Sequence, residues 1–436
     1  MVCIPNSPDD RCGAKNYLAR LIRYTMMRFY VILNILILCY GPVGGQTSDL
    51  FMPTDRQGRV EVPFTYENNF IVVEIIFNQI FPLRFILDTG AEHTILTNRE
   101  ITDMLAIDYQ RRFTIMGADL KTELYAYLVR GINLKMDDLS FLNRSILVLE
   151  QDYFRFDQFA GINVHGIIGA DILRRFVIEI NYRKETVTFI DPARFRPDRR
   201  DYREIDADFD RGKPYLFTSA LLANQQQVDT KLLMDTGASL SLLLYTNTDS
   251  LLRLPEQIIP SPLGLGLGGT LDGYLGRIPS FQLHTAFEFE DLVTNFQQLL
   301  SAADSSYLND RTGIIGHRLL DHFTLTLDYI REKVYLKQVK DFDEEMGYDK
   351  SGLFLRAFGA NLNKFEVFYI VPGSPADRAG LQVGDQLVRI NWWPTTFFNM
   401  QGIRRKLSKK PGKTIRLVVE RSGEKMRFVF DLEDLL

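Results

Sequence analysis

Two aspartates stand in matching surroundings in this chain. Asp88 opens the tetrapeptide Asp-Thr-Gly-Ala in FILDTGAEHTIL, and Asp235 opens a second copy in LLMDTGASLSLL. If their carboxyl groups lie close together, one stays protonated, because unit charges about 4 Å apart repel by roughly 4 kcal/mol at an effective dielectric near 20. The ionised group can take a proton from a water while the protonated group hydrogen-bonds a peptide carbonyl. Such a pair can hydrolyse a peptide bond without a metal or cofactor.

An internal repeat predicts that the two aspartates meet. Gly-Ile-Ile-Gly follows each aspartate after 78 residues, at Gly166–Gly169 and Gly313–Gly316 (166 − 88 and 313 − 235). The offset of 147 residues (235 − 88) also aligns Gly166–Phe189 with Gly313–Leu336 without a gap. A shared register of this length indicates a duplicated unit. We therefore expect two lobes that build one active site across a pseudo-twofold axis.

The residues beside each aspartate have matching uses. Thr89 and Thr236 can hydrogen-bond across the interface between the lobes. Gly90 and Gly237 let the backbone come close to the carboxylates and donate N–H groups to them. Gly-Ile-Ile-Gly lets a second strand pass beside each catalytic loop, where side chains larger than glycine would clash. The supporting residues of these two strands are Ile167, Ile168, Gly169, Ile314, Ile315 and Gly316.

Apolar runs rich in Ile, Val and Phe predict the strands that carry the aspartates. Ile71–Phe77 and Leu83–Leu87 are typical of a hairpin that leads into the first aspartate. Strands predominate throughout, with short helices expected near Asn98–Leu105 and Ala170–Arg175. The second lobe repeats the hairpin with Tyr215–Leu222 and Lys231–Met234.

Two charged stretches predict the boundaries between domains. Phe195–Pro214 separates the lobes, and Lys337–Gly352 separates the second lobe from a different C-terminal unit. We interpret both stretches as exposed connectors. The expected organisation is a leader at 1–45, the first lobe at 46–200, the second lobe at 201–340 and the C-terminal unit at 341–436.

The C-terminal unit has a pattern of its own. A strand runs into Pro372-Gly373, a short helix is expected over Pro375–Ala379, and Asp385 opens another strand through Ile390. Glycines between these elements permit tight turns. A second helix over Gly402–Lys410 and strands over Lys413–Val419 and Met426–Leu432 complete the unit.

Composition narrows the function classes. The chain of 436 residues is 46% hydrophobic and 24% charged, as in ordinary soluble globular proteins. A net charge of −4 gives no reason to expect nucleic acid as a partner. All three cysteines (Cys3, Cys12 and Cys39) lie in the first 39 residues, and the five histidines show no metal-ligand spacing. We expect no metal, no cofactor and no disulfide framework in the folded part.

The N-terminus has the pattern of a targeting segment. Arg28 precedes the apolar run Phe29–Tyr40, which is short for a membrane span, and Val43–Gly45 supplies small residues for cleavage before Gln46. We expect an exported protein, periplasmic, cell-surface or extracellular, with Met26 or Met27 as an alternative start. Lipidation at Cys39, an uncleaved anchor and a buried helix are the alternatives. Membrane contact is expected only through this segment.

Residues 60–340 resemble the aspartic peptidases of the pepsin and retropepsin type, nearest to retropepsin-like bacterial proteins. The resemblance implies Asp88 and Asp235 as catalytic residues. It also implies a β-hairpin flap over the cleft near Ile115–Leu120 and Gly264–Thr270. Ala91 and Ala238 replace a serine that steadies the pair in pepsin-like enzymes, so we hypothesise a pH optimum less acidic than that of pepsin. The expected flap residues are Met116, Gly117, Gly266 and Gly268.

Residues 351–436 resemble a PDZ domain of the circularly arranged type seen in secreted bacterial proteases. The resemblance is carried by Gly-Ser-Pro-Ala-x-x-Ala-Gly-Leu-x-x-Gly-Asp at Gly373–Asp385. PDZ domains bind an extended peptide by strand addition beside a loop that holds its carboxylate. We expect peptide-binding residues at Lys364, Phe365 and Val367, although Glu366 would repel a terminal carboxylate if it pointed inward.

The sequence thus predicts a mainly β protein, with bilobal pseudo-twofold aspartic-peptidase β-barrels followed by a small α+β PDZ domain. The predicted function is cleavage of a peptide or unfolded protein by an aspartic endopeptidase, with a peptide ligand, substrate or partner docked on the PDZ domain. One alternative is a non-catalytic peptide-binding scaffold that retains the peptidase fold. Another is a maturation protease dedicated to one partner chosen by the PDZ unit.

Overall fold

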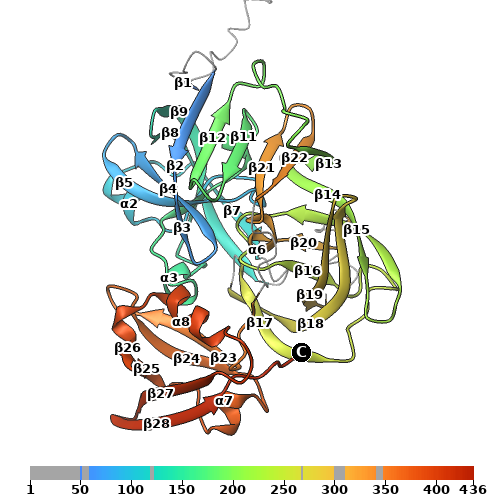
Figure 1. Ribbon diagram of the computed structural model, residues 1–436. Coiled ribbons are helices and arrows are strands. Elements are labelled where there is room, and N and C mark those ends of the chain that lie inside the picture. The colour runs from blue at the N-terminus through green and yellow to red at the C-terminus, as the bar shows by residue number, and fades with distance from the viewer. Residues whose placement is uncertain (1–49, 52–57, 118–121, 267–268, 299–309, 340–346) are drawn as a thin grey trace, which may run out of the picture. The chain divides into compact units, whose positions relative to one another are not determined.

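The computed structural model describes residues 50–51, 58–117, 122–266, 269–298, 310–339 and 347–436 (Figure 1). The expectations for the leader at 1–45, including Cys39, lie outside the described residues. Within the described ranges no helix is long and apolar enough to cross a membrane. The described chain is mainly strands, as the sequence predicts.

Most strands of the first lobe form one sheet. In β4 (Phe70–Phe77) and β5 (Phe81–Leu87) most side chains are buried, because both strands are rich in Ile, Val and Phe. Asn78 and Gln79, with φ of 46° and 63°, make the turn that joins them. The sheet runs β9 (Leu139–Leu149), β6 (Ile95–Leu96), β10 (Gly166–Ile168), β5, β4, β8 (Glu123–Met136), β7 (Arg111–Met116), with β3 (Thr65–Glu67) on β4 and β8 also paired with β9.

The strands of the second lobe repeat this plan. Here β14 (Lys213–Leu221) and β15 (Gln227–Met234) are the hairpin that leads into the second aspartate. A further pairing of β18 with β14 joins distant parts of the sheet. The order is β17 (Ile258–Gly266), β18 (Gly269–His284), β19 (Phe287–Gln297), β16 (Leu242–Tyr245), β20 (Gly313–Ile315), β15, β14, β13 (Arg203–Asp210).

The same sheet continues into the first lobe and carries the pseudo-twofold relation. Antiparallel pairing joins β11 (Val177–Asn181) to β21 (Phe323–Asp328), and Glu179 lies opposite Thr326, its own counterpart at the offset of 147 residues (326 − 179). The two repeats therefore meet along equivalent strands. From β13 the order is β22 (Lys333–Gln338), β21, β11, β12 (Thr186–Ile190), β2 (Arg59–Pro63).

The charged stretch Phe195–Pro214 is not simply an exposed connector. It contains β13, which pairs with β14 and β22, and Phe195 and Ile205 are buried. The charged residues of this stretch alternate with apolar ones that pack inward, so its many charged residues concealed a strand. Short helices interrupt the strands of the two lobes: α2 (Glu100–Met104), α3 (Phe156–Phe159), α4 (Ala170–Leu173) and α6 (His317–Leu320).

The C-terminal unit has its own sheet and its own apolar core. The core includes Phe365, Val367 and Leu387 from the strands and Ile403 and Leu407 from a helix. The sheet order is β23 (Leu353–Phe358), β24 (Lys364–Ile370), β25 (Gln386–Ile390), β27 (Thr414–Arg421), β28 (Glu424–Asp431), with β26 (Trp393–Pro394) on β25. Its helices are α7 (Pro375–Arg378), η1 (Thr395–Phe397) and α8 (Met400–Leu407).

Candidate active site

The two aspartates occupy equivalent places at the ends of β5 and β15. The Asp88 N–H donates to Ile168 O at 3.0 Å, and the Asp235 N–H donates to Ile315 O at 2.9 Å. These bonds continue two parallel strand pairs, β5 with β10 and β15 with β20. Gly-Ile-Ile-Gly therefore supplies the strand that supports each aspartate.

Two threonines link the catalytic loops to each other. The Thr89 N–H donates to Thr236 Oγ1 at 3.1 Å, and the Thr236 N–H donates to Thr89 Oγ1 at 3.1 Å. Each hydroxyl in turn donates to a backbone carbonyl of the opposite lobe, Met234 O at 2.6 Å and Leu87 O at 2.8 Å. Both threonines are completely buried. Four hydrogen bonds thus fix one loop against the other, and they are reciprocal because the lobes are related by the pseudo-twofold axis.

The carboxyl group of each aspartate lies against the glycine of the opposite loop. The Gly90 N–H donates to Asp88 Oδ1 at 2.7 Å, and the Gly237 N–H donates to Asp235 Oδ1 at 2.8 Å. A Cβ added to Gly90 would lie 2.5 Å from Asp235 Oδ2, and one added to Gly237 would lie 2.5 Å from Asp88 Oδ2. Only glycine leaves room for the carboxylate of the opposite lobe. The two carboxyl groups also hydrogen-bond each other.

Burial raises the pKa of both carboxyl groups above the ordinary value. For Asp88 the pKa is raised first by burial and then further by the charge of Asp235 and the hydrogen bond with it. For Asp235 the pKa is also raised by burial, but the hydrogen bond from Asp88, the Gly237 N–H and the charge of Arg311 act against the rise. The positive charge of Arg311 acts on Asp235 alone, so it favours Asp235 as the ionised member of the pair.

Comparison with known proteins agrees with this geometry. Residues 73–172 match the family model described as aspartyl protease, and residues 366–421 match the model described as PDZ domain. The chain carries an aspartyl protease domain and a PDZ domain. Both matches agree with the resemblances drawn from the sequence.

Individual proteins match smaller parts of the chain. Tax1-binding protein 3 of Homo sapiens and that of Mus musculus are each 39% identical over 51 residues, which are 12% of this chain and 41% of the relative. The match therefore spans less than half the length of these curated relatives. Among solved structures, conglutin gamma, a basic 7S globulin from lupine seeds, aligns with a TM-score of 0.41 and 12% identity over 66% of this chain and 97% of that chain.

Arg311 of the protease domain is a neighbour of the aspartates that sequence reasoning missed. Its Nη2 donates to Tyr245 Oη at 3.3 Å, and its guanidinium carbon lies 5.8 Å from the centre of that ring. The charge of Arg311 favours the ionised form of Asp235 and so acts to lower its pKa. The first lobe has Val164 at the equivalent position (311 − 147), so the repeat carried no signal for this arginine.

His317 lies behind the catalytic loop of the second lobe. Its Nδ1 is 3.3 Å from Thr236 O, and its ring stacks on Tyr66 with centroids 4.8 Å apart. The side chain is completely buried, and burial lowers the pKa of His317 to about 4. The imidazole is therefore neutral at physiological pH and can donate its Nδ1–H to the loop. Ala170 stands at the equivalent position in the first lobe (317 − 147).

The predicted flap positions fall at two hairpins of the protease domain. Gly117 follows β7, and its N–H donates to Thr122 O at 2.8 Å, next to β8. Gly266 pairs with Gly269 at the ends of β17 and β18. Gly268 lies outside the described residues, as do residues 118–121, and the side chain of Met116 is outside them too.

The predicted peptide-binding residues lie on β24 of the PDZ domain, where the side chain of Lys364 is exposed. Phe365 and Val367 are completely buried in the core, and β24 lies inside the sheet between β23 and β25. Glu366 is held by an ion pair with Arg356 at 2.6 Å. A strand already paired on both sides offers little backbone to a peptide. Among the described residues β23 pairs only with β24 and β28 only with β27, so each of these two strands has an edge open to strand addition.

Proposed function

We propose that this chain is an aspartic endopeptidase in which Asp88 and Asp235 together activate one water. The observation that carries the proposal is the convergence of the two carboxyl groups from separate lobes. Each is positioned by its own supporting strand, and each lies against the glycine of the opposite loop. A turn without a catalytic role has no need of such a reciprocal arrangement.

The proposed reaction follows from the asymmetry of the pair. Asp235, as the carboxylate, takes a proton from the water, while Asp88 hydrogen-bonds the scissile carbonyl and delivers its proton to the carbonyl oxygen. The water oxygen bonds to the carbonyl carbon and gives a neutral tetrahedral diol. When the C–N bond breaks, Asp235 gives the proton it took to the nitrogen, and a hydroxyl of the diol returns a proton to Asp88. One product leaves with a new amino terminus and the other with a new carboxyl terminus, and the pair regains its starting protonation. No covalent link to the enzyme forms at any step.

The other parts of the chain have roles that complete the proposal. The substrate is an extended peptide or unfolded segment under the β7–β8 and β17–β18 hairpins. The PDZ domain docks a substrate or a partner. The N-terminal segment directs export, with contact to a membrane only if that segment is retained or lipidated.

Substitution of each aspartate tests the proposal. We expect Asp88→Asn and Asp235→Asn each to reduce kcat/KM on an unfolded protein substrate by at least about 100-fold, because each removes one proton-transfer group. Asp229→Asn is the matched control, since Asp229 is exposed on the same strand, β15, and should retain full activity. Unchanged thermal unfolding of the variants would show that the fold is intact.

Two outcomes would contradict the proposal. Cleavage retained by both asparagine variants would exclude the aspartate pair. An intact, unmodified chain that binds peptides but cleaves none from a mixed library, with or without pepstatin, would instead indicate the peptide-binding scaffold.

A further inference from the structure

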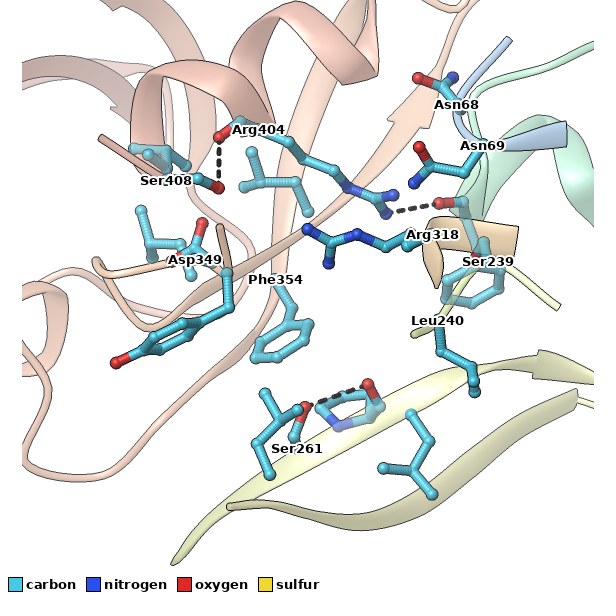
Figure 2. Close-up of a pocket in the computed structure, with 18 of the residues that line it drawn as sticks. Asn68, Asn69, Ser239, Leu240, Ser261, Arg318, Asp349, Phe354, Arg404 and Ser408 are labelled. Carbon is cyan, nitrogen blue, oxygen red and sulfur yellow. Dashed lines mark hydrogen bonds between the residues drawn. The ribbon is translucent and has the colours of Figure 1, made fainter. Parts of the chain in front are cut away.

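A cavity of about 420 Å³ lies between the PDZ domain and the catalytic lobes, and we call it the chamber (Figure 2). Its walls come from three places: the PDZ domain, the second lobe and the hairpin and helix of the first lobe around Asn68 and Phe159. Leu240, five residues after Asp235, lines the chamber. The chamber therefore borders the segment that directly follows the catalytic loop of the second lobe.

One wall of the chamber is the peptide groove of the PDZ domain. Gly352, Leu353 and Leu355 contribute the open edge of β23, and Leu407 contributes the end of α8. The Lys350 N–H donates to Leu407 O at 2.9 Å and ties the loop before β23 to the end of that helix. An extended peptide can add to β23 here through its backbone.

The first lobe fills the far end of this groove. A Cβ added to Gly161 would lie 2.9 Å from Met400 Cβ and 3.6 Å from Ala357 Cβ, so the chain passes between α8 and β23. Phe159 packs edge-on against Phe368 with ring centroids 5.3 Å apart. A peptide on β23 therefore has room only near Gly352 to Leu355, and must leave the groove into the chamber.

The loop before β23 already holds a carboxylate of the chain itself. Asp349 Oδ1 accepts the N–H groups of Ser351 at 2.8 Å and Gly352 at 2.9 Å, and the Ser351 hydroxyl at 2.6 Å. The Leu353 N–H donates to Ser351 Oγ at 3.1 Å. These backbone donors are thus occupied, and a ligand carboxylate in the chamber needs other partners.

Two arginines from different domains offer those partners. Arg404 of α8 and Arg318 of α6 both line the chamber (Figure 2). Arg404 Nη2 donates to Phe159 O at 3.1 Å, and Arg318 Nη2 donates to Gly347 O. Each arginine therefore uses one N–H group in a hydrogen bond to a backbone carbonyl. Each guanidinium has five N–H donors, which leaves several for a ligand.

The charges of these arginines are incompletely neutralised. The pKa of Arg318, whose side chain is half-buried, is lowered by burial. The pKa of Arg404 is lowered by the protein around its guanidinium group and by the charge of Arg318, although much of the Arg404 side chain is exposed. Asp321 beside Arg318 and Asp349 beside Arg404 offset part of this repulsion. A bound anion would relieve the rest, since two like charges in a partly buried chamber gain most from a shared counter-ion.

The chamber also has an acceptor for a peptide N–H. Asn68 lines it and is only 4% exposed, yet its Oδ1 has no hydrogen-bond partner among the described residues. Its Nδ2 donates to Ala160 O, which fixes the orientation of the amide. Apolar residues, among them Leu240, Pro262 and Leu353, line much of the remainder.

We propose that this chamber binds a carboxylate of the peptide substrate between Arg318 and Arg404, while the adjoining segment adds to β23. The carboxylate belongs to the C-terminus or to an Asp or Glu side chain. The inference rests on the proposed peptidase function and gives it a substrate class, peptides that carry a carboxylate. It also assigns the PDZ domain a part of the substrate-binding surface rather than a separate docking site.

Binding to an inactive full-length chain tests the inference independently of catalysis. The protein is the Asp88→Asn, Asp235→Asn double variant, and the probes are fluorescent ten-residue peptides measured by anisotropy. One ends in a free carboxylate with no acidic side chain, one is its C-terminal amide, and one is an amide with an internal Glu. We expect the fully uncharged amide to bind at least about 10-fold more weakly than one or both carboxylate peptides.

Arginine variants locate the binding site. Arg318→Gln and Arg404→Gln should each weaken binding of the favoured carboxylate peptide about 10-fold or more, whereas Arg416→Gln, an exposed arginine on β27, should not change it. A salt titration of the chain without arginine substitutions is a second measure of the electrostatic part of binding. The affinity for the favoured carboxylate peptide should fall as the NaCl concentration rises. Preference for the free terminus or for the Glu peptide identifies the source of the carboxylate.

The inference would be overturned by equal binding of all three peptides, or by affinities that neither arginine substitution changes. Cleavage by the unmodified chain is scored separately. Absence of cleavage with retained, arginine-dependent binding would reject the peptidase proposal and leave the carboxylate site in place.

Discussion

At the scale of single residues, proton affinities are set by burial and by neighbours. Asp88 and Asp235 stand in copies of one tetrapeptide, and burial raises the pKa of both. The repeat makes the two aspartates equivalent in position. Their neighbours differ, because the charge of Arg311 favours the ionised form of Asp235 alone.

The pH dependence of catalysis should report these shifts. Because the pKa of both aspartates is raised, activity should fall on the acidic side as Asp235 is protonated and on the alkaline side as Asp88 ionises. The apparent pKa values on the acidic side and on the alkaline side of the activity profile should therefore both exceed the ordinary aspartate pKa of about 3.9. The measurement is kcat/KM as a function of pH. A profile that peaks near pH 2 would contradict the raised pKa values of Asp88 and Asp235.

His317 should make the protein less stable in acid. The pKa of His317 is lowered from its ordinary value of 6.5 to about 4, so the unfolded chain binds this proton more readily than the folded chain does. The contribution of neutral His317 to the free energy of unfolding is fully present above pH 6.5. It is lost as the pH falls toward 4 and below, and the loss is up to about 3 kcal/mol.

A matched variant isolates the histidine. His317→Phe retains a ring to stack on Tyr66 but cannot titrate. Urea unfolding at pH 7 and pH 4.5 should show a larger loss of free energy of unfolding for the unmodified chain than for the variant. Equal losses would show that His317 does not carry the effect.

At the scale of elements, short glycine-bounded strands position the catalytic loops. β20 passes so close to β16 that a Cβ on Gly313 would overlap Leu243 O, and in the first lobe a Cβ on Gly166 would overlap Ile95 O. The obstacle is a backbone oxygen in both lobes, which cannot rotate away as a side chain can. This explains why the same glycine opens the motif twice.

Alanine at Gly313 should therefore disturb both stability and activity. We expect Gly313→Ala to cost about 1–3 kcal/mol of unfolding free energy and to reduce kcat/KM, because β20 supports Asp235. Gly276→Ala in β18 is the control, since the nearest atoms to its added Cβ are side-chain carbons of Pro255 and Phe296 at 3.0 and 3.2 Å. Equal losses in urea unfolding would contradict the backbone explanation.

At the scale of the whole described chain, the PDZ domain is built into the protease through specific contacts. The segment around Phe159 and Gly161 occupies part of its groove, and Arg277 of the second lobe pairs with Asp434 at 3.3 Å. The stretch Lys337–Gly352 was expected to be an exposed connector, but in its described part Tyr348 and Lys350 are buried, and Tyr348 lines the chamber.

Gly161 should reveal how much this docking contributes. Gly161 and Gly373 have similar left-handed φ angles, 67° and 73°, but only Gly161 would place a Cβ against a neighbour, whereas Gly373 meets nothing within 4 Å. Alanine at either position carries the same backbone cost, so the difference between the variants measures the contact with Met400. We expect Gly161→Ala to lower the free energy of unfolding by about 1–2 kcal/mol more than Gly373→Ala. Equal values in thermal unfolding would argue against tight docking.

Much of the fold could be predicted because its signals are local. The β4–β5 hairpin, the helix α7 and the strands β27 and β28 follow from apolar runs, proline and glycine within a few residues of one another. β13 could not be predicted, because its charged residues concealed the inward-facing apolar ones. The order of the strands in the PDZ sheet, with β24 inside it and β23 at an edge, could not be predicted either, because pairing between distant strands leaves no local pattern.

The pairing of Asp88 with Asp235 could be predicted from the chain alone, because a duplication is visible in residue identity and spacing. The groups that surround the pair became known only from the packing of distant segments. Arg318 and Arg404 are 86 residues apart (404 − 318), belong to different domains and follow no repeat. They face one chamber because the packing of the PDZ domain on the lobes brings α8 and α6 together, and such long-range packing leaves no periodic trace in either segment.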